Sequence, residues 1–392
     1  MFKKDEIKII SIFGVTGSVG VSTQELIHMN IKKFKVDTIV ANNDVKGLIK
    51  AAKYLKPNLV IINNDKMFMP LKKSLEGYKI EIASGNDAII EASKRKVDVF
   101  VAAISGFSGL NSTFNAIGNA KCIALANKES IVCAGPILLN KVKNSSSKII
   151  PIDSEHNTLY QILVNANIDS ISKLIITGSG GPFRGFSYKK LNKVTLEEAI
   201  NHPIWNMGKK ISVDSATLMN KGLELIEAAY LFNIKQKNID IIIHPESIIH
   251  GIVEFKDGSM NAGLSHPDMK SPISYALHYP NKVKANIKKL NLTLIKSLNF
   301  EEVDTSVFKS INISRSALKQ GHGFVISLNA VNEVAVESFI KNNISFNAII
   351  NIIEESLSKI KIHNINNLED IFIVDNKARK ISKQIIKNGN FK

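Results

Sequence analysis

The sequence predicts an α/β protein that begins with a doubly wound parallel sheet and ends in a helical bundle. Short β-branched runs alternate with helical stretches up to about residue 150, and loops rich in Gly and His follow. Apolar residues then recur at helical spacing to the end of the chain. We therefore expect an α/β domain over 1–150, an α+β catalytic domain over 151–279, a linker over 280–305 and a helical domain over 306–392.

Seven apolar runs predict the strands of the first domain. They are IKIISIFG, VDTIVA, PNLVIIN, KIEIAS, VDVFVAAI, KCIALA and KIIPID. Their apolar residues are continuous rather than alternating, which indicates strands buried on both faces, as in a parallel sheet covered by helices. Segments 18–33 and 85–96 have the length and periodicity of connecting helices.

The rest of the chain divides into a loop-rich part and a helical part. The segment 248–265 predicts paired strands around the turn at Asp257-Gly258. Residues 325–343, 345–360 and 369–387 carry apolar residues three and four positions apart, which predicts three amphipathic helices.

Composition excludes several classes of protein. The 51 basic and 35 acidic residues give a net charge of +16, but the basic residues are scattered and form no stripe with aromatics, so we expect no nucleic-acid partner. No uncharged apolar stretch reaches 18 residues, so we expect no membrane span, and the N-terminus has no signal-peptide pattern. The two cysteines, Cys122 and Cys133, exclude a disulfide framework and a structural zinc site, and favour the cytoplasm.

The glycine pattern Gly14-Val15-Thr16-Gly17-Ser18-Val19-Gly20 lies between a predicted strand and a predicted helix. Glycines permit a tight turn and close approach of a pyrophosphate to the helix N-terminus. This context favours a Rossmann-like, dinucleotide-binding domain, although a glycine turn needed only for packing would look similar. The second strand ends in Asn42-Asn43-Asp44, with Lys46 nearby, and this spacing does not decide between NAD and NADP.

An acidic segment follows the seventh predicted strand. Asp153 and Glu155, with a third carboxylate, would form a hard oxygen site for Mg²⁺ or Mn²⁺ if a turn begins there. The alternative is that Asp153 or Ser154 only caps a helix. Lys128 follows the sixth predicted strand, at an edge of the sheet where ligands bind.

Three further segments carry polar groups suited to a phosphorylated substrate. Asn220, Lys221 and Glu224 share one face of a predicted helix, although an isolated Lys–Glu pair at this spacing is usually a solvated surface pair. The loop 178–183, GSGGPF, could hold a phosphate on its backbone N–H groups, or be an ordinary glycine loop. The loop around His202 and Trp205 could close over a substrate, or be pinned by its tryptophan.

Taken together, these segments resemble the 1-deoxy-D-xylulose 5-phosphate reductoisomerase family. The matching stretches are GVTGSVG, ANKES, PIDSEHN, GSGGPF, HPIWNMGKKISVDSATLMNKGLE, IIHPESIIH, HPDMKSP and LNAVNEVAV. The resemblance implies an NADPH-dependent oxidoreductase that rearranges and reduces 1-deoxy-D-xylulose 5-phosphate to 2-C-methyl-D-erythritol 4-phosphate, the committed step of the non-mevalonate isoprenoid pathway. It also implies a divalent metal (Mg²⁺, Mn²⁺ or Co²⁺), a small phosphorylated sugar as substrate and a homodimer in the cytoplasm.

The resemblance also implies roles for individual residues. The metal ligands are Asp153, Glu155 and Glu224, and the catalytic residues are Lys128, Glu155 and His202. The substrate is further contacted by Ser154, Ser179, Ser215, Asn220, Lys221 and Glu224. Trp205 and Met207 form a lid within a mobile loop at about 202–210. The cofactor is contacted by Thr16, Gly17, Ser18, Val19, Asn42, Asn43, Asp44, Asn127, Glu129 and Gly208, and Met269 lines the nicotinamide or substrate side.

One position departs from the family pattern. Many members carry a lysine after the second strand, where this chain has Asn42-Asn43-Asp44, and Lys46 could substitute. We therefore expect NADPH, with a weaker preference over NADH than is usual. The alternatives are another two-domain NAD(P)-linked dehydrogenase, which would need no metal, and a non-catalytic nucleotide- or nucleic-acid-binding protein.

Overall fold

The computed structural model describes residues 7–205, 207–361 and 364–391. Contacts between residues divide them into two compact units. Unit 1 consists of residues 7–130, 138–157 and 268–288, and unit 2 consists of the described residues in 131–137, 158–267 and 289–391.

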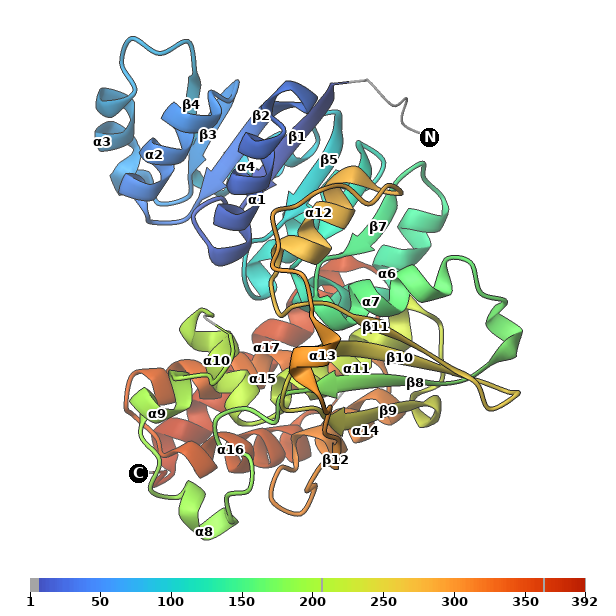
Figure 1. Cartoon of the computed structure of the whole chain (residues 1–392). Helices are drawn as coiled ribbons and strands as arrows, with labels where there is room; N and C mark the ends of the chain where they lie inside the picture. The colour runs from blue at the N-terminus through green and yellow to red at the C-terminus, as the bar shows by residue number, and fades with distance from the viewer. Residues whose placement is uncertain (1–6, 206, 362–363, 392) are drawn as a thin grey trace. The chain divides into compact units, whose positions relative to one another are not determined.

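Unit 1 is built on a seven-stranded parallel sheet (Figure 1). Its strands are β1 (Lys8–Phe13), β2 (Phe34–Ala41), β3 (Leu59–Ile62), β4 (Glu81–Ser84), β5 (Val97–Ala102), β6 (Ala120–Leu125) and β7 (Lys148–Pro151). The order is β4-β3-β2-β1-β5-β6-β7, and every pairing is parallel. All seven predicted strands are confirmed. Because β1 pairs with both β2 and β5, the strand order reverses beside β1, where doubly wound proteins bind their ligands.

Helices connect and cover these strands. They are α1 (Ser18–Met29), α2 (Val45–Leu55), α3 (Phe68–Ser74), α4 (Gly85–Ser93) and α5 (Leu110–Ala116), with α12 (Lys270–His278) from much later in the chain. Helices α6 (Lys128–Lys143) and α7 (Ser154–Leu163) begin in unit 1, and each has residues in both units. The strands are apolar on both sides because both faces are covered: Ile12 and Phe13, neighbours on β1 whose side chains point to opposite faces, have no exposed surface.

Helix α12 belongs to unit 1, although we expected residues up to 279 in the catalytic domain. Residues 272–278 are all buried, and the helix packs against α1, β6 and β7. Lys8 Nζ donates to the carbonyl of Leu277 over 2.9 Å, which ties α12 to the first strand. Apolar periodicity identifies the buried face of a helix but not the sheet that this face covers.

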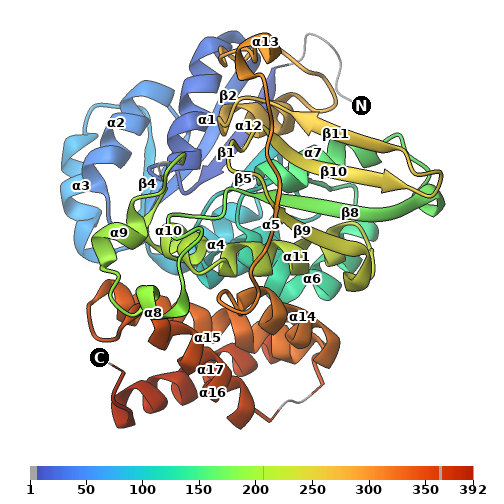
Figure 2. The same ribbon diagram turned by 60° about the horizontal axis from the view of Figure 1, so that its bottom comes forward.

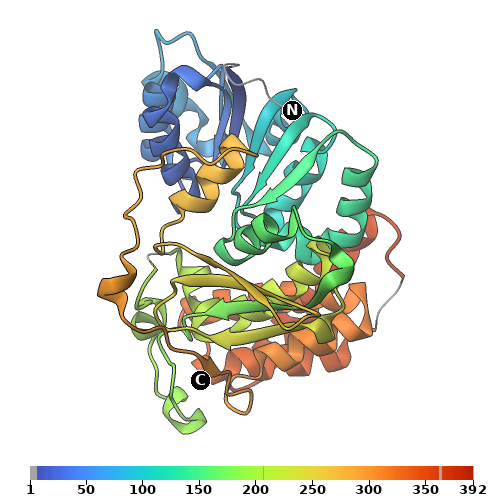
Figure 3. The same cartoon turned by 45° about the vertical axis from the view of Figure 1, so that its right-hand side comes forward.

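Unit 2 contains a five-stranded mixed sheet (Figure 3). Its strands are β8 (Ile171–Gly178), β9 (Ile239–Ile243), β10 (Ile249–Phe255), β11 (Met260–Leu264) and β12 (Glu301–Glu302), in the order β11-β10-β8-β9-β12. The predicted hairpin is present: β10 and β11 are antiparallel, and Gly258 turns between them with φ of 86°. One apolar core joins this sheet to helices α11 (Met219–Leu231) and α14 (Ser310–Gln320) through residues such as Leu174, Leu225 and Ile311.

Helices make up the remainder of unit 2 (Figure 2). They are α8 (Tyr188–Leu191), α9 (Leu196–Ile200), α10 (Lys209–Ala216), α13 (Leu292–Ile295), α15 (His322–Ile340), α16 (Phe346–Lys359) and α17 (Leu368–Asn388). The three predicted C-terminal helices are α15, α16 and α17. Helix α15 is apolar and long enough to cross a membrane, but it packs against α14, α16 and α17, and 72% of its most apolar stretch is buried. It is the core helix of this bundle.

The segment expected as a linker contains regular structure. Helix α13 lies within it, and β12 pairs with β9 at the edge of the mixed sheet through Glu301 and Glu302. The division of unit 2 into a catalytic and a helical domain stays a prediction.

Candidate active site

The glycine loop of unit 1 connects β1 to α1 in a conformation that requires two of its glycines. Gly14 has φ of +100°, and a Cβ there would lie 2.3 Å from the carbonyl oxygen of Ala103. A Cβ on Gly20 would lie 2.3 Å from the carbonyl oxygen of Gly14. The turn brings Gly17 and Ser18, both exposed, to the N-terminus of α1, where backbone N–H groups favour an anion.

Four asparagines form two amide pairs at the ends of β2 and β3. Asn63 Nδ2 donates to Asn42 Oδ1 over 3.0 Å, and Asn64 Nδ2 donates to Asn43 Oδ1 over 2.9 Å. In this arrangement the Nδ2 groups of Asn42 and Asn43 still have hydrogens to donate. Asp44 caps α2 by accepting from the N–H of Gly47 over 2.9 Å. The carboxylate of Asp44 therefore caps a helix, and its predicted contact with the cofactor stays a prediction.

A lysine and two carboxylates meet where β6 and β7 end. Lys128, the first residue of α6, is 6% exposed, and its Nζ lies 2.7 Å from Asp153 Oδ2. Asp153 Oδ1 also accepts from the N–H of Glu155 over 3.3 Å, so Asp153 additionally caps α7. Ser154 Oγ donates to Glu155. Capping and ligand binding, posed as alternatives for Asp153, are thus compatible.

In unit 2, Lys221 and Glu224, for which a solvated surface pair was the alternative, are buried. Glu224 is 1% exposed and Lys221 is 7% exposed. Lys221 Nζ lies 2.5 Å from Glu224 Oε2, and Asn220 Nδ2 donates to Glu224 Oε1. The surface-pair alternative is therefore wrong for α11. A desolvated carboxylate needs such hydrogen-bonding partners, and they fix the position of the Glu224 side chain.

The glycine loop after β8 packs on the same elements. A Cβ on Gly178 would lie 2.9 Å from Cε of Lys221, and a Cβ on Gly181 would lie 2.7 Å from the carbonyl oxygen of Ser215. The loop therefore lies directly against both α10 and α11. Ser179, Ser215 and Lys221, which the resemblance assigns to the phosphate pocket, are thereby brought into one region of unit 2.

His202 fixes the hydrogen-bonding role of Ser179. The backbone N–H groups of Ile204 and Trp205 donate to His202 Nδ1 over 3.2 and 2.9 Å, so the ring hydrogen lies on Nε2. Nε2 lies 3.0 Å from Ser179 Oγ, which also accepts from the N–H of Gly181 over 3.2 Å. Because Ser179 accepts both bonds, its own hydrogen can be donated to an anion.

Burial, reinforced by the charge of Lys221, lowers the pKa of His202 to about 4. The folded protein therefore binds a proton here less readily than the unfolded chain, whose histidine titrates near the ordinary value of about 6.5. Stability contributed by the neutral ring is complete above pH 6.5 and is lost as the pH falls towards 4. We expect His202→Gln to reduce the fall in Tm between pH 6.5 and pH 4. An unchanged pH profile of Tm would contradict this.

The loop 202–208 joins α9 to α10. The ring of Trp205 lies 6.4 Å from the ring of His250, which is buried on β10. Trp205 and Met207 are half-buried, and Gly208 is the exposed N-cap of α10. Asn206 lies outside the described residues. Closure of this loop over a substrate and anchoring of the loop by Trp205 both remain predictions.

The other residues predicted to contact the cofactor lie in unit 1. Asn127 caps α6 and donates to the carbonyls of Ile104 and Gly106 over 2.7 and 2.8 Å and to Glu129 over 3.1 Å. Asn127 and Glu129 are buried, and Met269 is the half-buried N-cap of α12. Asn127 thus holds the loop that follows β5.

Three groups that lie beside predicted residues in the structure were not predictable from the motifs. Asn63 and Asn64 support Asn42 and Asn43. The third is Asn332, whose amide donates to the buried carboxylate of Asp214 over 2.8 Å. The position of Asn63-Asn64 directly after an apolar strand was the available signal for the first two.

Comparison with known proteins gives one consistent result. Three family models match: 1-deoxy-D-xylulose 5-phosphate reductoisomerase over residues 10–135, its C-terminal domain over 149–232, and the DXP reductoisomerase C-terminal domain over 264–381. The 1-deoxy-D-xylulose 5-phosphate reductoisomerase of Ehrlichia canis is 42% identical over 97% of this chain and 99% of its own. The one from Zymomonas mobilis is 40% identical over 95% and 96%.

Solved structures agree. The Zymomonas mobilis reductoisomerase in complex with NADPH has a TM-score of 0.92 and 38% identity, covering 98% of this chain and 100% of its own. A DOX-P reductoisomerase in complex with NADPH, fosmidomycin and magnesium has a TM-score of 0.91 and 38% identity, with the same coverage.

Proposed function

The chain belongs to the 1-deoxy-D-xylulose 5-phosphate reductoisomerase family, and we propose from this which of its residues carry the reaction. The protein is an NADPH-dependent enzyme that uses a divalent metal and acts on a small phosphorylated sugar, converting 1-deoxy-D-xylulose 5-phosphate to 2-C-methyl-D-erythritol 4-phosphate. The observation that carries this conclusion is 42% identity over 97% of the chain.

The metal ligands are the first part of the proposal. Carboxylate oxygens suit Mg²⁺, Mn²⁺ and Co²⁺, and Asp153 and Glu155 supply them at the start of α7. Glu224 is the third ligand by resemblance to the family. When bound, the ion acts as a Lewis acid towards the carbonyl and hydroxyl oxygens of the substrate.

Side chains of unit 1 act on the reacting part of the substrate. Lys128 is held at its position by Asp153, and its ammonium stabilises negative charge that develops on the substrate oxygens. Glu155 accepts and returns a proton, and its contact with Ser154 orients it. Ser154 in turn donates to the substrate when Glu155 is engaged by metal.

Side chains of unit 2 bind the phosphate. Lys221 supplies the positive charge, and Ser179, Ser215 and Asn220 supply hydrogen bonds. His202 donates to Ser179 and so leaves the serine hydrogen directed to the phosphate. A neutral histidine suits this position because it accepts on one ring nitrogen and donates from the other. Trp205 and Met207 cover the substrate and exclude water.

NADPH supplies the hydride for the reduction step. The N-terminus of α1 binds its pyrophosphate through Thr16, Gly17, Ser18 and Val19. The amides of Asn42 and Asn43 donate to the 2′-phosphate. Asn127, Glu129 and Gly208 contact the remainder, and Met269 lines the nicotinamide.

Cofactor selectivity tests the role of the amide pairs. We expect Asn63→Ala combined with Asn64→Ala to lower the NADPH/NADH ratio of kcat/KM by about tenfold, because Asn42 and Asn43 lose the partners that orient them. The matched control is Asn58→Ala, whose amide contacts Asp37 instead. An unchanged ratio would show that other groups, such as Lys46, read the 2′-phosphate.

The activity itself is tested by following NADPH absorbance with 1-deoxy-D-xylulose 5-phosphate. Oxidation of NADPH with Mg²⁺, Mn²⁺ or Co²⁺, abolished by EDTA and restored by excess metal, is the expected result. Oxidation that is insensitive to EDTA would refute the metal site.

The homodimer and the cytoplasmic location are also proposals. The first is supported by the resemblance to the family and is tested by light scattering of the purified protein. The second is supported by the burial of both cysteines, Cys122 and Cys133; burial raises the pKa of Cys122 to about 12, so this thiol stays protonated.

A further inference from the structure

Helix α10 connects two features of unit 2 that the proposed function uses. Its N-cap is Gly208, at the end of the loop that carries Trp205 and Met207. Its seventh residue is Ser215, in the proposed phosphate pocket. Whatever fixes this helix therefore fixes both the pocket and one end of the loop.

Apolar burial alone holds α10 weakly. The helix has eight residues, and its buried apolar side chains are Val213 and Ala216. So short a helix is not stable by itself and depends on tertiary contacts.

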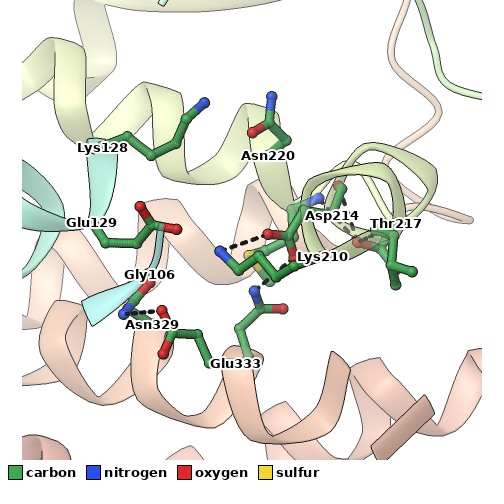
Figure 4. A network of polar contacts seen from close by, with 12 residues as sticks. Gly106, Lys128, Glu129, Lys210, Asp214, Thr217, Asn220, Asn329 and Glu333 are labelled. Atoms are coloured by element: carbon green, nitrogen blue, oxygen red, sulfur yellow. Dashed lines mark hydrogen bonds and ion pairs between the residues drawn. The ribbon is translucent and has the colours of Figure 1, made fainter. Parts of the chain in front are cut away.

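A buried polar contact provides such an attachment (Figure 4). Asp214 is 1% exposed, and its Oδ1 accepts from Asn332 Nδ2 over 2.8 Å. Asn332 has no exposed surface and comes from the core helix α15, 118 residues later. Lys210, one turn earlier on α10, lies 2.9 Å from Asp214 Oδ2. A buried carboxylate is costly without partners, so the bond to Asn332 is strongly favoured.

Hydrogen bonds also hold the C-terminal end of the same helix. The single hydroxyl hydrogen of Thr217 is shared between the carbonyls of Val213 and Asp214, which lie 3.1 and 3.2 Å from Oγ1. Ser310 Oγ donates to the carbonyl of Thr217 over 2.7 Å. The close approach of Gly181 to the Ser215 carbonyl means that a small shift of α10 would displace the glycine loop.

We propose that Asp214 and Asn332 form a latch that attaches α10 to α15 and thereby positions Ser215 and the C-terminal end of the lid loop for binding of the substrate phosphate. Both are positioning residues, since they contact each other rather than substrate. The inference rests on the proposed phosphate role of Ser215, and it explains why a polar Asn-bearing stretch lies inside an apolar core helix.

A reciprocal exchange tests the latch. Asp214→Asn and Asn332→Asp are made singly and together, and kcat and KM are measured for 1-deoxy-D-xylulose 5-phosphate and NADPH. Each single variant is expected to raise KM for the sugar phosphate about tenfold, because one lacks the carboxylate and the other opposes two carboxylates. The KM for NADPH should stay within twofold. The double variant restores one amide–carboxylate bond and is expected to return to within threefold of the parent enzyme.

Phosphate binding provides a readout that does not need turnover. Inorganic phosphate is titrated while the fluorescence of Trp205, the sole tryptophan, is recorded. The two single variants should bind inorganic phosphate about tenfold more weakly than the parent enzyme, and the double variant should regain the parent affinity. An exchange variant that folds but binds phosphate as weakly as the worse single would overturn the latch.

Controls separate positioning from stability. Ser327→Ala removes a buried hydrogen bond within α15 itself, and should lower Tm without changing KM. If Asn332→Asp does not fold, it is replaced by Asn332→Ser, whose side chain is polar but shorter. Asn332→Ser should also raise KM for the sugar phosphate, and an unchanged KM would refute the latch. Ser215→Ala tests the phosphate role of Ser215 itself. If Ser215→Ala leaves phosphate binding unchanged, the proposed pocket is refuted. If Ser215→Ala weakens phosphate binding but the variants of Asp214 and Asn332 do not, only the latch is refuted.

Discussion

Glu224→Gln is expected to lower kcat by about 100-fold or more, with little change in the fold. Gln has the shape of Glu and can keep a contact with Asn220, but it lacks the negative charge that a divalent ion requires. The loss should be partly offset by raising the metal concentration, so kcat is measured as a function of Mg²⁺ and Mn²⁺. The circular dichroism spectrum and Tm serve to confirm folding.

The control for Glu224→Gln is Glu254→Gln, which removes a carboxylate from β10 where it accepts from Ser172 over 2.7 Å. It should leave the metal dependence as it is. Near-full activity of Glu224→Gln at low metal would show that Glu224 is not a ligand and that its burial serves only to fix Lys221.

Lys221→Gln is expected to raise KM for the sugar phosphate by about 100-fold, with kcat falling much less. The side chain is 7% exposed, and a charge-assisted bond to phosphate in such surroundings contributes about 1.5–3 kcal/mol. Inorganic phosphate should bind more weakly by a similar factor. This distinguishes loss of a phosphate ligand from a general loss of structure.

The matched control is Lys173→Gln. Lys173 pairs with Asp240 over 2.9 Å, but both side chains are more than 40% exposed. Exposed ion pairs contribute little, so this variant should keep both KM values. If Lys221→Gln lowers kcat and leaves KM unchanged, Lys221 acts on the reaction rather than on the phosphate.

The sheet of unit 1 could be predicted from the sequence because its strands are continuously apolar, and only burial on both faces produces that pattern. The glycine loop was equally readable, since Gly14 and Gly20 occupy positions where a side chain would collide with backbone. The hairpin at Gly258 followed from its turn residues. In each case the signal is local, so neighbouring residues sufficed.

Features that depend on distant parts of the chain were not predictable. A Lys–Glu pair three residues apart looks the same whether it is exposed or, like Lys221 and Glu224, buried beneath a glycine loop. The amide pairs join residues 21 positions apart, and the Asp214–Asn332 contact joins residues 118 apart. Helix α12 showed an apolar face, but its assignment to unit 1 depends on the surface left by β6 and β7.

The late position of α12 has a consequence for synthesis on the ribosome. Residues 272–278 cover part of the first sheet, yet more than a hundred residues of unit 2 are translated between β7 and this helix. Until α12 emerges, the apolar surface of β6 and β7 that it covers stays exposed on the nascent chain. Unit 1 therefore cannot finish folding before most of unit 2 has been synthesised. A chain truncated before residue 268 would keep this apolar surface exposed, where chaperones could bind it.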